Sequence, residues 1–148
     1  MRQGVIHLSE PIPAIKPAIL ICEAHEGLQE AFRLMLEDWA SISFVAQAEP
    51  IFATLAQERP DLLILDMDGQ AAEPMVLVER LRTAYPELKV LLVAGQFDYD
   101  FQVACVKLGQ LSFLTKPFSA PAAVAKMKAL LGLAVPSIRT RVVKIALS

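Results

Sequence analysis

The sequence lacks several features that would each indicate a class of protein. None of its apolar runs approaches the roughly 18 uninterrupted residues of a membrane span. Its first residues lack the hydrophobic segment of a signal peptide, because histidine, glutamate and prolines interrupt positions 7–13. Only two cysteines are present, Cys22 and Cys105, and both lie in apolar surroundings typical of reduced core thiols. We therefore expect a cytoplasmic protein with no membrane association and no disulfide.

Acidic residues are absent from the C-terminal third of the chain. Residues 1–100 hold all 16 acidic and 7 of the 14 basic side chains. A basic segment can bind nucleic acid, but here the basic residues are thinly spread and no aromatic residues lie between them. Nucleic-acid binding is therefore not expected. The hydrophobic share of 55% against 20% charged residues instead favours one globular α/β domain with a buried sheet.

The clearest element is an apolar run that ends at an acid. Four aliphatic residues, Leu62 to Leu65, lie between Pro60 and Gly69 without polar alternation, as in a parallel strand buried on both faces. Asp66 follows directly, at the carboxyl end of that strand, where open α/β sheets bind their ligands. A carboxylate buried there needs a cation or a hydrogen-bond network.

Similar apolar runs alternate with helical periodicity along the rest of the chain. We expect strands at 18–22, 42–48, 62–65, 88–94 and 111–115, and helices at 25–39, 50–57, 74–85, 98–108 and 119–131. Five strand–helix units predict a flavodoxin-like, doubly wound parallel sheet with the strand order 2-1-3-4-5.

Two extensions flank this domain, which we place at residues 18–132. Residues 1–17 form an N-terminal extension, and residues 133–148 form a C-terminal one in which 138–145 has the partial alternation of an extra strand. Residues 5–8 are also prone to β-structure. One hypothesis is that either segment pairs with a sheet edge, in the same chain or in a homodimer; the alternative is a frayed terminus.

Three strand ends carry polar residues that the predicted topology brings together. Glu23 follows the first strand, Asp66 the third and Lys116 the fifth. The first and third strands are neighbours in this order, so Glu23, Asp66 and Asp68 can gather as oxygen ligands for Mg²⁺. Lys116 would neutralise the remaining negative charge. The alternative for Asp66 and Lys116 is a purely structural ion pair.

The chain resembles the receiver domain of two-component response regulators over roughly residues 18–132. The resemblance is carried by four stretches: 19–23, 61–66, 90–95 and 113–118, the last with its Lys116-Pro117 pair. It implies that Asp66 accepts a phosphoryl group from a histidine kinase or phosphotransfer protein, with Mg²⁺ bound by acidic neighbours and Lys116 contacting the phosphoryl oxygens. A hydroxyl residue ending the fourth strand and an aromatic in the fifth would relay the change to a downstream protein partner.

The sequence departs from this pattern at several positions. The usual pair of acids after the first strand is here Glu23 and Ala24, so we expect Mg²⁺ to bind weakly or not at all. Ala94 stands at the position of the switch hydroxyl, and Phe113 keeps the aromatic of the relay without a hydroxyl. Gln70 replaces a common proline. The metal site and the switch are both reduced.

Three functions are therefore compared. The first is a receiver that is phosphorylated on Asp66 and acts by protein contact rather than as an enzyme. The second is a pseudo-receiver that binds its partner independently of phosphorylation. The third is a phosphatase of the haloacid-dehalogenase type, because Asp66 to Gly69 matches its DxDG motif. That fold needs a further acid after its lysine, and none follows Asp100.

Overall fold

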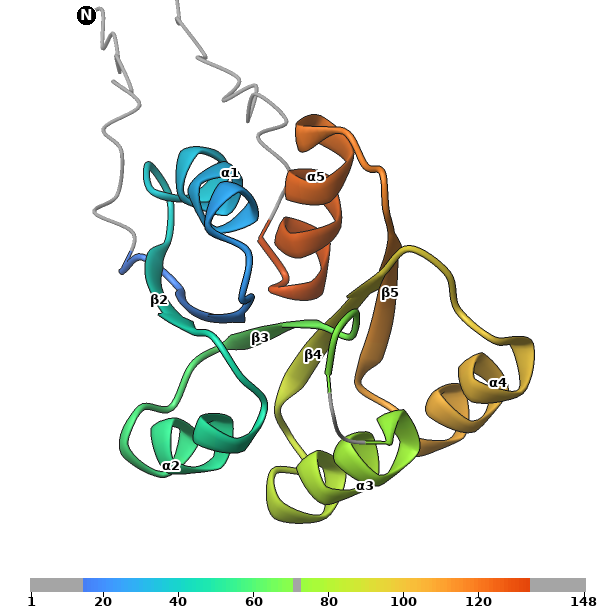
Figure 1. The fold of residues 1–148 in the computed structure, drawn as a ribbon. Helices are drawn as coiled ribbons and strands as arrows, with labels where there is room; N and C mark the ends of the chain where they lie inside the picture. Colours follow the sequence, from blue (N-terminus) through green and yellow to red (C-terminus); the bar gives the residue numbers. More distant parts are fainter. Residues whose placement is uncertain (1–14, 71–72, 134–148) are drawn as a thin grey trace, which may run out of the picture.

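The computed structural model describes residues 15–70 and 73–133 (Figure 1). Strands and helices alternate throughout these segments. The strands are β1 (Ala18–Cys22), β2 (Ser41–Val45), β3 (Leu62–Asp66), β4 (Lys89–Ala94) and β5 (Leu111–Thr115). The helices are α1 (Glu26–Leu36), α2 (Glu49–Gln57), α3 (Pro74–Ala84), α4 (Tyr99–Leu108) and α5 (Ala120–Leu130).

The five strands form one parallel sheet in the order β2-β1-β3-β4-β5, which confirms the predicted topology. Its register pairs Ile21 with Ile64, Leu65 with Leu92, and Ala94 with Thr115. All strands therefore run the same way, and their carboxyl ends lie along one edge of the sheet.

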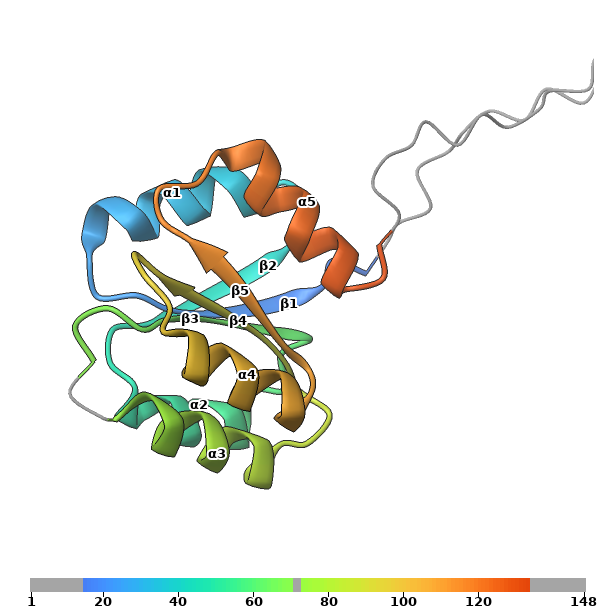
Figure 2. The same ribbon diagram turned by 90° about the vertical axis from the view of Figure 1, so that its right-hand side faces the viewer.

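Helices cover both faces of the sheet. Helices α1 and α5 lie on one face and α2, α3 and α4 on the other, as the two views show (Figures 1 and 2). Leu62 and Ile64 belong to the core under the first pair, whereas Leu63 and Leu65 belong to the core under the second group. This packing explains why β3 is apolar without alternation: both of its faces are buried.

Side-chain caps and prolines lie at the starts of several helices. The Ser119 hydroxyl accepts a hydrogen bond from the Ala122 amide, and the His25 ring accepts one from the Leu28 amide. Pro74 is the first residue of α3, and α4 ends at Gly109, whose φ of 78° suits a residue without a side chain. Asp98 precedes α4, but its side chain makes no capping bond.

Two predicted elements extend clearly beyond the ends of those in the structure, whereas the others differ by about one residue at either end. The helix expected over 25–39 ends at Leu36, because the chain turns and the Trp39 and Ala40 amides both bond to the Leu36 carbonyl. Trp39 still packs against the core that contains Phe32 and Leu36. Its position in the apolar spacing therefore predicted a longer helix than the one that forms. The strand expected over 42–48 ends at Val45, since a bend leads into α2 at Glu49.

The predicted strand segments at 5–8 and 138–145 lie outside the described residues, and their pairing stays a prediction. Within the part of the chain that the structure describes, no helix is both long and apolar enough to cross a membrane.

Candidate functional site

The predicted acids and lysine meet at the carboxyl edge of the sheet. Glu23 follows β1, Asp66 ends β3 and Lys116 follows β5. Backbone bonds fix two of these positions: the Glu23 amide donates to the Val45 carbonyl over 2.9 Å, and the Lys116 amide donates to the Ala94 carbonyl over 2.8 Å. Glu23 is 4% exposed and Asp66 is 3% exposed. Two almost fully buried carboxyl groups therefore lie beside one ammonium group.

Lys116 joins two carboxylates. Its Nζ lies 2.6 Å from Oδ2 of Asp66 and 3.1 Å from Oδ2 of Asp68. Burial alone would lower the pKa of Lys116, but the hydrogen bonds and charges of Asp66 and Asp68 raise it above its usual value. The lysine stays charged and balances the buried negative charge of Asp66.

Glu23 is held at only one of its carboxyl oxygens. Oε1 accepts a hydrogen bond from the His25 amide over 3.0 Å. Oε2 is buried and accepts none from the residues that the structure describes. Burial, together with a hydrogen bond to Asp66 that exists when Glu23 is protonated, raises the pKa of Glu23 to about 7. Near neutral pH, Glu23 can therefore hold a proton or release it in favour of a cation.

The residues predicted to bind Mg²⁺ are only partly gathered. Glu23 and Asp66 offer neighbouring oxygens, and the unpartnered Oε2 of Glu23 suits a hard cation. The Asp68 carboxylate is instead hydrogen-bonded to Lys116 and to the Gly95 amide. Across residues 15–70 and 73–133, no cluster of three or more His, Cys, Asp or Glu residues is close enough to hold a metal ion.

Two further residues, to which the sequence analysis gave no role in the site, contribute hydrogen bonds to it. The Gly95 amide, just after β4, donates to Oδ2 of Asp68 over 3.0 Å. The Gln70 side chain donates to the Asp66 carbonyl over 2.9 Å and so ties the loop after β3 to the strand end. The Asp68 amide donates to Oδ1 of Asp66 over 2.8 Å. The loop thus folds back over the carboxylate that ends β3.

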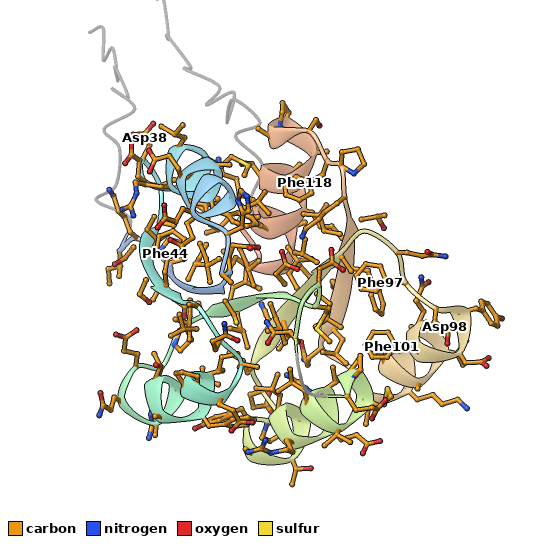
Figure 3. All side chains as sticks on the ribbon, viewed as in Figure 1. Asp38, Phe44, Phe97, Asp98, Phe101 and Phe118 are labelled. Carbon is orange, nitrogen blue, oxygen red and sulfur yellow. The ribbon has the colours of Figure 1, made fainter. Side chains whose placement is uncertain are left out.

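The two predicted switch positions lie on the β4–β5 side. Ala94 is buried and pairs with Thr115, and its neighbourhood includes a pocket of about 450 Å³ that Asp68, Phe97 and Phe101 also line. Figure 3 shows the Phe97 and Phe101 rings one above the other beside α4, where they are stacked at 6.4 Å. Phe113 meets the Phe97 ring edge-on at 5.1 Å. Phe113 is therefore in direct aromatic contact with residues at the start of α4.

A second pocket, separate from the one that Ala94 lines, is an apolar groove beside Lys116. It has a volume of about 780 Å³ and runs between α1 and α5. Its lining includes Lys116 and the apolar residues Leu28, Leu34, Met35, Pro117, Phe118 and Val124. The Phe118 ring lies 6.0 Å from that of Phe32 under this groove. Apolar residues of α1 and α5 therefore line a groove that reaches Lys116.

Residues 19–128 match the family model described as the response regulator receiver domain. Among curated proteins, the nitrogen assimilation regulatory protein NtrX of Azorhizobium caulinodans is 29% identical over 105 residues, covering 69% of this chain and 23% of that protein. The phosphate regulon transcriptional regulatory protein PhoB of Rhizobium meliloti is 29% identical over 126 residues, covering 82% and 55%. The chain thus spans about a quarter to about half of these relatives.

Solved structures share the fold at low sequence identity. A response regulator from Thermotoga maritima superposes with a TM-score of 0.70 at 23% identity, covering 80% of this chain and 99% of that one. The chemotaxis protein CheY4 of Vibrio cholerae superposes with a TM-score of 0.69 at 15% identity, covering 77% and 98%. At these identities the likeness concerns the fold alone.

Proposed function

This chain belongs to the family of response regulator receiver domains, and we propose that Asp66 is its phosphoryl acceptor. Receiver domains are signalling modules of two-component systems, and phosphorylation of an aspartate is the mechanism of the family. The observation that carries the proposal is the contact of 2.6 Å between Lys116 Nζ and Oδ2 of the buried Asp66, at the ligand-binding edge of the sheet.

The chemistry follows from this contact. A carboxylate oxygen of Asp66 attacks the phosphorus of a phosphohistidine, the P–N bond breaks, and an acyl phosphate forms as the imidazole leaves. Lys116 lies within reach of the transferred oxygens and would neutralise their charge. An ammonium group has three donors, so it can keep its bond to Asp66 while another donor turns to the phosphoryl group.

Glu23 and Asp66 would hold a Mg²⁺ ion, which when bound neutralises charge on the phosphoryl oxygens. Its affinity would be low for two reasons. Ala24 supplies no second acid after β1, and Glu23 must first lose a proton that it holds with a pKa of about 7. Loading with the metal is therefore coupled to pH.

The groove between α1 and α5 would receive the phosphodonor, a histidine kinase or a phosphotransfer protein in the cytoplasm. It is apolar, and Lys116 is part of its lining, so a helical donor seated there would bring its histidine to Asp66. Output would pass to a downstream protein from α4, whose Tyr99 and Val106 side chains are exposed.

The acceptor is tested by incubating the protein with acetyl phosphate and Mg²⁺ and measuring intact mass. We expect the mass of one phosphoryl group to appear, and to be absent from Asp66→Asn. Asp98→Asn, which makes the same charge change at an exposed residue without a side-chain hydrogen bond, should be phosphorylated normally. No adduct on the unmodified protein, or an adduct that persists in Asp66→Asn, would refute the proposal.

The donor surface is tested with Leu34→Asp, which places a charge in the groove. Leu34 is 66% exposed, so the fold should tolerate the change. Transfer from a phosphorylated histidine domain should slow, while labelling by acetyl phosphate stays the same. Val106→Asp on α4 is the matched control, because Val106 is 69% exposed and lies outside the groove.

A pseudo-receiver is the second candidate. Ala94 offers no hydroxyl to a phosphoryl group, and Lys116 already has two carboxylate partners. In that case the downstream partner would bind Asp66→Asn and the unmodified protein equally well, with or without beryllofluoride.

A further inference from the structure

The Asp68 carboxylate is bound like a small anion at the end of the sheet. A single oxygen, Oδ2, accepts from Lys116 Nζ over 3.1 Å and from the Gly95 amide over 3.0 Å. These two donors come from the ends of β5 and β4, whereas Asp68 itself follows β3. The side chain is 51% exposed, so the carboxylate enters the site from solvent and can also leave it.

The same donors are those that a phosphoryl group on Asp66 would require. Lys116 Nζ already contacts Oδ2 of Asp66, and Oδ1 of Asp66 is held by the Asp68 amide. A group attached to Oδ2 of Asp66 would therefore lie beside Lys116, whose other partner, Oδ2 of Asp68, also accepts from the Gly95 amide. Ala94 adds no hydroxyl there. An entering phosphoryl group must take its bonds from donors that Asp68 already uses, and it must also face a like charge.

We propose that the Asp68 carboxylate is an internal anion that occupies the place of the phosphoryl oxygens and competes with them for Lys116 and the Gly95 amide. The proposal rests on the proposed function, because it takes Asp66 as the acceptor. In the unmodified protein, Asp68 links the ends of β4 and β5 without phosphorylation. Phosphorylation of Asp66 then requires that the Asp68 carboxylate first leaves Lys116 and the Gly95 amide.

A different role for Asp68 predicts the opposite outcome. If its carboxylate were a ligand of Mg²⁺, as its sequence position suggested, removing the charge would weaken binding of the metal and of phosphoryl analogues. If its contacts were a surface ion pair of no consequence, removing the charge would change neither. The three roles thus differ in the sign of one measurement.

The test is a titration of the whole chain with beryllofluoride in the presence of Mg²⁺, read by NMR. Asp68→Asn keeps the shape of the side chain and removes its charge. Asp98→Asn is the control, because it removes one charge from the loop that follows Gly95 without breaking a side-chain hydrogen bond. We expect Asp68→Asn to bind about 10-fold more tightly than the unmodified protein and the control, since hydrogen bonds to charged groups are worth about that much. Equal or weaker binding overturns the proposal.

A second titration separates this inference from the proposed function. Inorganic phosphate without Mg²⁺ probes the space beside Lys116 and needs no reaction at Asp66. We expect it to shift the Gly95 amide resonance in Asp68→Asn and not in the unmodified protein. If no variant binds beryllofluoride, the acceptor role of Asp66 fails, and the phosphate titration still decides: a shift limited to Asp68→Asn supports the internal anion, and its absence refutes it.

Discussion

The ends of β1, β3 and β5 differ in chemistry from the β4–α4 side of the same edge. At the first, the nearly buried carboxyl groups of Glu23 and Asp66 lie beside the partly buried ammonium group of Lys116. At the second, Ala94 is followed by a glycine, and the stacked rings of Phe97 and Phe101 make the contact with α4. The groups that we propose to receive a phosphoryl group are present, whereas Ala94 has no hydroxyl that could relay its arrival to α4.

This difference says how the two regions can communicate. A change at Asp66 can reach the β4 end through the hydrogen bonds of Lys116, Asp68 and the Gly95 amide. It can also reach β4 through the pairing of Asp66 with Val93 in the sheet. Since a group shifts a conformational equilibrium only by its differential contacts in the two states, a site with few such contacts moves α4 little.

The largest effect is expected from Lys116→Met, which removes the cation from the charged side. Asp66 would be left buried without its ion-pair partner, so the free energy of unfolding should fall by about 3 kcal/mol. Urea denaturation measures this change. Glu30→Gln, which breaks the exposed pair with Arg33, should cost no more than about 0.5 kcal/mol. A loss below about 1 kcal/mol for Lys116→Met would mean that the buried pair is not what holds these strand ends.

Completing the charged side with Ala24→Asp should strengthen Mg²⁺ binding. A second acid after β1 adds an anionic oxygen ligand, so the affinity should rise about 10-fold in calorimetric titration. Ala125→Asp adds the same charge on the exposed surface of α5 and should leave the affinity unchanged. Tight binding in the unmodified protein, unaltered by Ala24→Asp, would contradict the account of a reduced metal site.

Ala94→Thr restores a hydroxyl on the β4–α4 side, and Ala94→Val adds the same volume without one. Beryllofluoride should bind the threonine variant about fivefold more tightly than the valine variant, because only the hydroxyl can donate to the phosphoryl analogue. NMR shift changes over α4 should also be larger in the threonine variant. Equal responses from the two variants would show that volume at position 94, and not the hydroxyl, limits the relay.

The smallest effect concerns the proton on Glu23. Its pKa in the folded protein is about 7, above the ordinary value of 4.5, because of burial and its bond to Asp66. The folded state therefore holds this proton more strongly than the unfolded state, and its stabilising effect is lost as pH rises from 4.5 to about 7.

Glu23→Gln removes the titrating carboxyl group and, with it, the loss of stability as the pH rises. The variant should gain about 1 kcal/mol in free energy of unfolding relative to the unmodified protein at pH 8, and the gain should vanish toward pH 4. Urea denaturation at several pH values measures it, with the exposed Glu26→Gln as a control that should show no such trend. A gain in the free energy of unfolding that does not depend on pH would show that Glu23 does not bind this proton.

The fold and the main site residues could be predicted from the sequence because each rests on a repeated pattern. Unalternating apolar runs such as Leu62 to Leu65 mark buried parallel strands, and the polar residue after each strand must lie at one edge. The end of α1 could not be predicted, because Trp39 folds back onto the core and continues the helical spacing.

The hydrogen-bond network of the site could not be predicted from the sequence either. The Gly95 amide is a backbone group with no sequence signature, and nothing in the order of residues says which way the Asp68 side chain turns. In the sequence, Gln70 stood out only because it occupies the position of a common proline. In the structure, its side-chain amide donates a hydrogen bond to the Asp66 carbonyl. Strand ends follow from topology, but the partners of each side chain depend on loop geometry.

The most direct test of the whole account is the NMR spectrum of the unmodified protein before and after addition of beryllofluoride and Mg²⁺. We expect clear shifts at Asp66, Asp68, Gly95 and Lys116, and only slight ones over α4 and Phe113. Unchanged resonances around Asp66 would contradict its role as the acceptor. Large shifts throughout α4 would contradict the reduced relay through Ala94.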